Sequence, residues 1–362
     1  MSFRNIVQSA LLCLLAVCAS SMGGTLDKGY VVGVYYFPGW KLAPPFAKAP
    51  PWDAIRKYGD RQPLLGWYEE GSVDVATKQL AWMRKYGIDL VIYDWYWTDK
   101  DGPALTQAID AYLQSPRRHD VGFSILWANH TGTPSSLQQF DAIVDYWIST
   151  YFKRDSYYRI DGRPVVFIFS PDELEQKAKA LGVDVPYLFA RAREKATNAG
   201  LRGIYFVGAT QATNDLVRKR LPAASYDAIS AYNYHLGLQG RYSKDMPLSH
   251  SYRELMNGYQ ESWEWILKNS PLPYFVPVTS GWDKRPWGGS PDKLHDNSYS
   301  TADEFGEHLA DAKAWLDRYP EKTRRTVVIC CWNEYGEGSY IEPTVEKQFD
   351  YLERIKNTFR TK

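Results

Sequence analysis

Short apolar segments alternate with longer segments of helical periodicity between residues 31 and 359. The short segments are rich in Val, Ile, Phe and Tyr, and most are apolar along their whole length, as strands buried on both faces are. They predict eight strands, at Val31–Phe37, Leu90–Asp94, Val121–Trp127, Val165–Phe169, Ile204–Val207, Ala228–Tyr232, Tyr274–Val278 and Val327–Cys331.

The intervening segments predict helices, and Asp172 and Thr301 stand where helix N-caps belong. Eight strand–helix units in alternation predict a (β/α)8 TIM barrel, and the count of eight argues against the rival, a doubly wound open sheet. No Ser/Gly linker or compositional break is seen, so one domain with long loops after its strands is expected over residues 29–362. The expected helices are 73–86, 104–114, 137–152, 173–198, 213–219, 252–268, 302–318 and 345–359.

The N-terminus has the features of an export signal. Arg4 precedes an apolar stretch at residues 10–17, and small residues follow at 19–21, as a signal peptidase requires. The stretch is too short to anchor the chain across a bilayer. A signal peptide is therefore expected at residues 1–22, with the mature protein in the periplasm, on the cell surface or outside the cell. Lipid anchoring at Cys18 is the lesser alternative, because Val fits the lipoprotein box poorly at the position before the Cys.

Charge and cysteine content exclude several classes of protein. The formal net charge is +1, so no global field attracts nucleic acid or an anionic membrane, and no later segment is apolar enough to span a bilayer. The mature chain keeps only Cys330 and Cys331, for which two buried thiols are expected in preference to a disulfide. No CxxC, HExxH or Gly-rich phosphate loop indicates a metal or a cofactor, and none is expected. The oligomeric state is open, with a monomer as the default.

The C-terminal ends of the predicted strands carry polar and aromatic side chains, and in barrels the chemistry lies at those ends. The chain has 14 Trp and 27 Tyr, and aromatic clefts often stack on sugar rings, although a large core also needs large side chains. An oligosaccharide or polysaccharide substrate is therefore expected. The residues expected to contact it are Tyr36, Trp40, Asp94, Trp95, Trp127, Asn129, His130, Tyr232, Asn233, Trp282, Asp283, Arg285, Trp332, Asn333, Tyr335 and Glu342.

Several of these residues have structural interpretations of equal weight. Asp94 is as well suited to holding a neighbouring Asn or Arg as to binding a sugar hydroxyl. His130 is as often a structural hydrogen-bonding group, and Asp283 with Arg285 is consistent with a plain loop ion pair. Glu342, directly before Pro343, is consistent with a helix cap.

Glu334 and Glu337 are expected to be the catalytic residues. A spacing of three in a helical turn brings Cβ atoms to roughly 5–6 Å, and retaining glycosidases need two carboxyls about 5–5.5 Å apart. One carboxyl must be held protonated, and the apolar Trp and Tyr neighbours would raise its pKa by desolvation. The alternative is that both are capping acids at the start of the last helix.

The stretch Trp332–Gly338 with Ile341–Pro343 resembles the W-N-E-W-x-E-G-x-x-I-E-P signature of glycoside hydrolase family 99, which also appears in the related WbsX-like domains of polysaccharide biosynthesis. The matching motifs together cover about residues 31–344. The weaker ones are Tyr35–Trp40, Gln62–Glu69, Ser280–Asp283 and, for the WbsX-like branch, Trp127–Asn129.

Family 99 enzymes are (β/α)8 barrels that cleave α-mannosidic bonds within a chain with retention of configuration. The resemblance implies that Glu337 is the acid/base at the leaving oxygen. It implies that Glu334 takes the proton of the sugar 2-OH, whose oxygen attacks the anomeric carbon and forms a 1,2-anhydro sugar. The family has Trp-His between its glutamates where this chain has Tyr335-Gly336, which leaves the identity of the sugar open.

The leading hypothesis is an exported retaining glycoside hydrolase, endo-acting on α-mannoside-like 1,2-trans glycans. Its rival is a WbsX-like glycosyl-transferring enzyme, against which the export signal argues because sugar-nucleotide donors are cytoplasmic. A non-catalytic carbohydrate-binding barrel is a third reading. A metal-dependent hydrolase that uses Asp94, His130 and His235 is a fourth.

Overall fold

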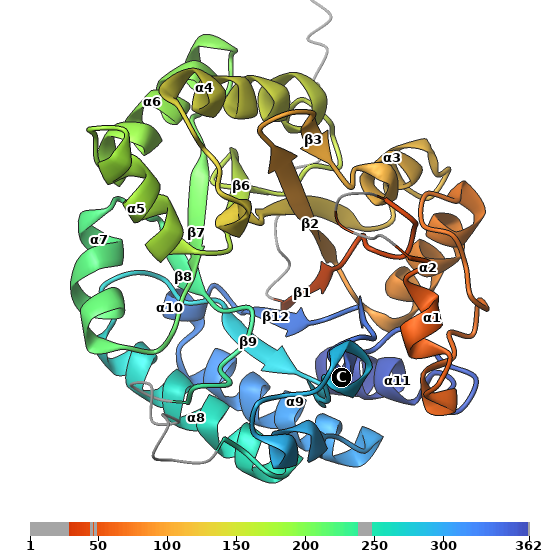
Figure 1. The fold of residues 1–362 in the computed structure, drawn as a ribbon. Helices are drawn as coiled ribbons and strands as arrows, with labels where there is room; N and C mark the ends of the chain where they lie inside the picture. Colours follow the sequence, from red (N-terminus) through yellow and green to blue (C-terminus); the bar gives the residue numbers. More distant parts are fainter. Residues whose placement is uncertain (1–28, 44–45, 47–48, 238–247, 361–362) are drawn as a thin grey trace, which may run out of the picture.

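The expected (β/α)8 barrel is confirmed in the computed structural model, which describes residues 29–43, 46, 49–237 and 248–360 (Figure 1). The expected signal peptide and Cys18 lie outside these residues. Eight parallel strands form the ring in the order β8-β7-β6-β4-β2-β1-β12-β9. Their bounds are β1 Val31–Tyr36, β2 Leu90–Thr98, β4 Gly122–Trp127, β6 Arg163–Ile168, β7 Tyr205–Ala209, β8 Ala228–Ser230, β9 Val276–Thr279 and β12 Thr326–Cys330.

The ring is closed between its first and last members. Ile229 of β8 forms a parallel bridge with Tyr274, just before β9, and the N–H of Phe275 donates to the carbonyl of Ile229 at 2.9 Å. Since all eight strands run the same way, the loops that follow them meet at one face. Short antiparallel strands decorate the ring: β3 Gly102–Ala104, β5 Arg159–Ile160, β10 Gly281–Trp282, β11 Ser298–Tyr299, β13 Asn333–Glu334 and β14 Ser339–Tyr340.

Helices surround the ring on its outside (Figure 1). Most expected helices are present with shifted ends, and α4 continues into a π-helical turn at Trp147–Phe152. The expected helix 213–219 is a π-helical turn at Leu216–Arg220 that leads into a short α7. The helices are α1 Trp52–Ile55, α2 Val73–Tyr86, α3 Gln107–Gln114, α4 Leu137–Tyr146, α5 Pro171–Ala180, α6 Val185–Asn198, α7 Leu221–Ala223, α8 Tyr252–Asn269, α9 Ala302–Arg318, α10 Pro320–Thr323 and α11 Asp350–Phe359.

The single helix expected at residues 173–198 is wrong, because the chain breaks it into α5 and α6. Gly182 lies between them with φ of 75°, in the left-handed region that glycine adopts without a Cβ clash. Asp184 then caps α6 by accepting a hydrogen bond from the N–H of Tyr187 at 2.8 Å. Local turn chemistry therefore overrides the continuous helical periodicity.

One of the two expected N-caps is confirmed. Thr301 caps α9 in a reciprocal capping box with Glu304. The cap of α5 is Ser170 and not Asp172, since the Ser170 hydroxyl accepts from the N–H of Glu173 at 3.2 Å. Asp172 lies in the first turn, where its carboxylate pairs with Arg220 at 2.5 Å.

Two apolar layers follow from the alternation of side chains along each strand. Tyr35, Ile92 and Phe167 belong to the cluster inside the barrel. Their strand neighbours, such as Tyr36 and Tyr93, belong to the larger cluster between the strands and the helices. The direction of each side chain at a strand end is therefore fixed by its parity relative to these positions.

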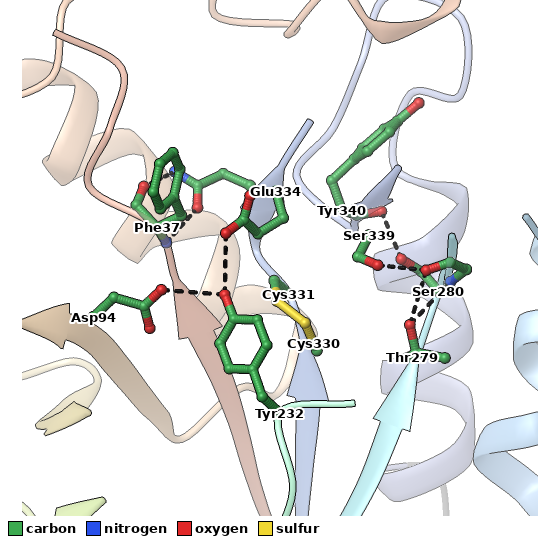
Figure 2. Close-up of a disulfide and its surroundings, with 12 residues drawn as sticks. Phe37, Asp94, Tyr232, Thr279, Ser280, Cys330, Cys331, Glu334, Ser339 and Tyr340 are labelled. Carbon is green, nitrogen blue, oxygen red and sulfur yellow. Dashed lines mark hydrogen bonds between the residues drawn. A yellow bond between two sulfur atoms is a disulfide. The ribbon is translucent and has the colours of Figure 1, made fainter. Parts of the chain in front are cut away.

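Cys330 and Cys331 form a disulfide, so the expectation of two free thiols is wrong (Figure 2). Both residues belong to the cluster inside the barrel. β12 ends at Cys330, so Cys331 lies beyond the ladder that would otherwise send successive side chains to opposite faces.

Within the described ranges, no helix has an apolar stretch of the length needed to cross a membrane.

Candidate functional site

Glu334 and Glu337 lie in a β-hairpin that follows β12. Asn333–Glu334 pairs antiparallel with Ser339–Tyr340, and Glu334 lies opposite Ser339. The N–H of Glu337 donates to the carbonyl of Glu334 at 3.2 Å. The expected helical turn is therefore a tight hairpin loop. It brings the two carboxyls together at the carboxyl end of the barrel by a different backbone route.

Asn333 fixes this hairpin to the loop that follows β1. Its side-chain amide donates to the carbonyl of Phe37 at 2.9 Å, and its side-chain oxygen accepts from the Phe37 N–H at 2.9 Å. The indole of Trp40 donates to the Asn333 carbonyl at 3.0 Å. Asn333 is wholly buried, so it holds the hairpin on the side that faces the protein interior.

A buried polar network supports the hairpin from the outer side. The Glu342 carboxylate accepts hydrogen bonds from Gln79 at 2.7 Å, from Tyr68 at 2.8 Å and from Tyr335 at 2.9 Å. The pKa of Glu342 is raised to about 7, because burial outweighs the opposing effect of the three hydrogen-bond donors. Trp40 stacks on Trp52 beside this network, with ring centroids 4.0 Å apart.

Arg61 ties three loops together. It is buried, and it donates to the backbone carbonyl of Tyr335 at 2.6 Å, to that of Asp283 at 3.1 Å and to the Asp283 carboxylate. Asp283 also accepts from Arg285 at 2.7 Å, so the ion pair that the sequence suggested for these two residues is present. Sequence reasoning missed Arg61, because a loop residue outside any periodic pattern gives no signal of its partners.

Tyr232 joins Asp94 to Glu334 at the centre of the mouth (Figure 2). Its hydroxyl lies 3.1 Å from Asp94 Oδ2 and 3.1 Å from Glu334 Oε1. The three side chains come from the middle of β2, the segment after β8 and β13. Among the described residues, Asp94 Oδ1 and Glu334 Oε2 have no hydrogen-bond partner. Two carboxyls thus lie on one phenol with little access to water.

The electrostatics of this cluster favour protonated carboxyls. Burial raises the pKa of Glu334 well above its usual value, and the neighbouring Glu337 and Asp94 raise it further. Burial also raises the pKa of Glu337, to about 7, and the Lys284 ammonium lowers the pKa of both glutamates. Because like charges so close cannot both ionise freely, Glu334 and Glu337 titrate as a pair.

Two hollows flank the cluster on the loop face. One of about 210 Å³ borders Tyr232 and Asn233 and extends over the ends of β6 and β7 to Phe169 and Thr210. The other, of about 330 Å³, lies over the loop after β1 and is lined largely by aromatic and proline side chains, which are Trp40, Pro50, Pro51, Trp52, Trp67 and Tyr68.

The structure brings some of the remaining predicted residues to the loop face. His130 is exposed and packs against Phe169, with ring centroids 4.8 Å apart. Trp282 is buried in the larger apolar cluster, and its ring packs on that of His235 with centroids 3.8 Å apart. Asn129 is buried instead, where its side chain bonds both backbone groups of Ser170 at 2.7 and 2.8 Å.

Other predicted contact residues point away from the mouth. Tyr36, Trp95, Trp127 and Trp332 are buried in the cluster between the strands and the helices, which corrects the expectation that they touch substrate. The reason is strand parity: because Asp94 faces the barrel interior, Trp95 faces outward, where it packs on Trp147.

Glu70 is buried and accepts from the Tyr36 hydroxyl at 2.6 Å, and burial raises its pKa to about 8. Asp94 lies on Tyr232, His130 packs on Phe169 and His235 packs on Trp282. The described part of the chain contains no group of three or more His, Cys, Asp or Glu placed to hold a metal ion.

Solved structures similar to this chain include two glycosidases and a protein described as glycoside hydrolase-like. A "glycoside hydrolase-like protein" is 15% identical, with 92% of this chain and 95% of that chain covered and a TM-score of 0.67. The GH99 endo-alpha-mannosidase from Bacteroides thetaiotaomicron, in complex with bis-tris-propane, is 18% identical, with 92% and 96% covered and a TM-score of 0.62. A family 1 β-glucosidase from Thermotoga maritima is 11% identical, with 92% and 99% covered and a TM-score of 0.52. These likenesses establish the fold.

The family itself is established by sequence. The family profile described as "Glycosyltransferase WbsX" matches residues 56–355, which is most of the chain. The chain therefore belongs to the WbsX family, and the resemblance to WbsX-like domains is confirmed. No match is found among curated proteins.

Replacing Arg61 should destabilise the protein far more than replacing Arg285. The Arg61 side chain is 3% exposed and that of Arg285 is 49% exposed, although both pair with Asp283. We expect Arg61→Met to lower the free energy of unfolding by about 3 kcal/mol, because it leaves buried acceptors unpaired, and Arg285→Met to lower it by less than about 1 kcal/mol. Urea titration followed by tryptophan fluorescence measures both. Equal losses would contradict the role given to Arg61.

Proposed function

We propose that the protein is a retaining glycoside hydrolase that cleaves α-mannoside-like, 1,2-trans glycans within the chain, with Glu334 and Glu337 as the catalytic residues. The observation that carries the proposal is the asymmetry of the pair. Tyr232 donates toward Glu334, whereas no described side chain donates to Glu337. The Tyr232 hydrogen bond lowers the pKa of Glu334 against the burial and like charges that raise it, and Glu337 has no such donor among the described residues, so a single proton on the pair is favoured on Glu337. Membership of the WbsX family and the fold of a GH99 endo-alpha-mannosidase support this proposal.

In the proposed first step, protonated Glu337 donates its proton to the oxygen of the leaving sugar. Ionised Glu334 takes the proton of the 2-OH, and the freed oxygen attacks the anomeric carbon from the side opposite the leaving group. The bond to the leaving oxygen breaks, and a 1,2-anhydro sugar forms. In an α-mannoside the axial 2-OH is trans to the leaving group, as this displacement requires.

In the second step the roles reverse. Glu337 takes a proton from water, whose oxygen attacks the anomeric carbon, and Glu334 returns its proton to the 2-oxygen as the three-membered ring opens. Two inversions at the anomeric carbon give net retention. The charge on the enzyme is the same before and after the cycle, and no covalent enzyme intermediate is formed.

A glycosyl-transferring enzyme is the second candidate, favoured by the description of the WbsX family as glycosyltransferases. The same two glutamates would serve it, with a sugar hydroxyl in place of water in the second step. Product analysis separates the candidates. Hydrolysis gives new reducing ends in step with substrate loss, whereas transfer between glycans gives longer chains.

We further propose that the chain is exported and that its signal peptide is removed near residue 22. The support is the N-terminal pattern of Arg4 followed by an apolar stretch and small residues. Intact-mass measurement of the protein from its native host should give a chain that begins between residues 19 and 24 and is found outside the cytoplasm. A full-length cytoplasmic chain would contradict export, and a lipid-modified Cys18 would replace soluble export by anchoring.

Glu334→Gln and Glu337→Gln should each lower kcat by a factor of about 10² to 10⁴ while glycan binding persists, because each removes a proton-transfer group. Proton NMR of the reaction on a panel of α-mannans should show the α-anomer as the first product of the wild type. Glu264→Gln, at an exposed position of α8, is the control and should behave as the wild type. A β-anomeric first product would contradict the mechanism, and full activity in either glutamine variant would contradict the residue assignment.

The pH profile of kcat/KM should fall as pH rises through about 7, because Glu337 must be protonated and burial sets its pKa at about 7. Lys284 lowers that pKa, so Lys284→Met should raise it and move the alkaline limb to higher pH. Lys313→Met, which removes a cation on α9 paired with Asp317, should leave the limb in place. An alkaline limb that stays or moves down in Lys284→Met would refute the assignment of Glu337 as the acid.

A further inference from the structure

The hydroxyl of Tyr232 has two carboxyl neighbours and one hydrogen. It lies 3.1 Å from an oxygen of Asp94 and 3.1 Å from an oxygen of Glu334. A phenol can donate one hydrogen bond and accept others, whereas an ionised carboxylate can only accept. Both contacts are hydrogen bonds only if one carboxyl is protonated and donates to the Tyr232 oxygen.

The surroundings oppose a charge on Asp94. It is 5% exposed, and its Oδ1 has no partner among the described residues. A carboxylate there would be a buried charge without a cation in contact, which is costly, whereas a neutral acid is tolerated. The titratable and charged groups that face Asp94 or the glutamates beside it are Tyr232, Glu334, Glu337 and Lys284, together with Tyr35 of β1 and Tyr96 of β2, whose own pKa values the Asp94 charge raises.

The cation in this group is positioned for the glutamates. Lys284 acts on both Glu334 and Glu337, and the influences on Asp94 are burial, the Tyr232 hydroxyl and the like charge of Glu337. The Lys284 ammonium lowers the pKa of Glu334 and so favours a negative charge there. A second charge on Asp94 would be balanced by nothing in contact with it.

We propose that Asp94 is a positioning residue that stays protonated, donates its hydrogen bond to Tyr232 and so directs the Tyr232 O–H to the Glu334 carboxylate. The proposal rests on the proposed function, in which Glu334 must be ionised to take the 2-OH proton. Asp94 neither gains nor loses a proton during turnover. Its bond to the Tyr232 oxygen strengthens that phenol as a donor and holds its ring in place.

The proton on Asp94 is measured directly by infrared spectroscopy on protein labelled with ¹³C in its aspartate carboxyls. At pH 7 the wild type should show an isotope-shifted carbonyl band of a protonated acid that Asp94→Asn lacks. This readout needs no substrate, so it separates the proposal from the proposed function. A wild-type spectrum identical to that of Asp94→Asn in this region overturns the proposal, whatever the glycan assays give.

The kinetic test compares two replacements of similar size. The acidic limb of the pH profile is the fall in kcat/KM at low pH, where Glu334 becomes protonated. Asn keeps an N–H donor for Tyr232 without charge, so Asp94→Asn should keep kcat/KM within about threefold and leave this limb in place. Leu has no donor, so Asp94→Leu should lower kcat/KM by about tenfold or more and move the acidic limb to higher pH, because Glu334 loses support for its charge.

An ionised Asp94 predicts a different result. Its replacement by Asn would remove a negative charge beside Glu334, lower the pKa of that glutamate and move the acidic limb to lower pH. That shift would overturn the proposal. Thermal unfolding followed by circular dichroism verifies that both variants fold. If Asp94→Leu does not fold, the comparison of Asp94→Asn with the wild type and the infrared band still decide the outcome.

Discussion

The pair of hydrogen bonds between the Asn333 side chain and the backbone of Phe37 determines where the hairpin that carries Glu334 and Glu337 lies. These bonds join the first loop of the barrel to the last, at 2.9 Å each. The amide both donates and accepts, so no side chain that only donates or only accepts can replace it. Arg61 fixes the same hairpin from its far side through the carbonyl of Tyr335. With both ends held, the carboxyls of Glu334 and Glu337 take their positions from the barrel and not from a free loop.

The architecture could be predicted because each of its units is a local pattern. Strands buried on both faces are apolar throughout, and eight of them in alternation with helices favour one architecture. Thr301 was recognisable as a cap because Glu304 completes its box. The break between α5 and α6 was equally visible, since Gly182, Asp184 and Pro186 are a helix stop followed by a start. The helical periodicity continues across this break, and for that reason the pattern predicts a single helix at residues 173–198.

Sequence motifs alone give neither the direction of a side chain nor the geometry of a hairpin. Because successive strand residues face opposite ways, placing Asp94 in the barrel places Trp95 among the helices. The same alternation places Tyr36, Trp95 and Trp127 outside the barrel and so removes these three aromatic residues from the expected contact set. The hairpin depends on Gly338, whose φ is 71° and whose Cβ would meet the Asp283 backbone nitrogen at 2.7 Å. Contacts between distant loops, such as those of Arg61, have no local signature at all.

The two kinds of glutamate in this barrel differ in what surrounds them and not in burial. Glu342 and Glu334 are 1% and 5% exposed, but Glu342 has three donors that satisfy both its oxygens. Glu334 has one donor and an oxygen with no partner among the described residues. The three donors oppose the burial that raises the pKa of Glu342 and fix that carboxyl in its network. Glu334, partly bonded and beside a second carboxyl, keeps an oxygen that can accept a proton.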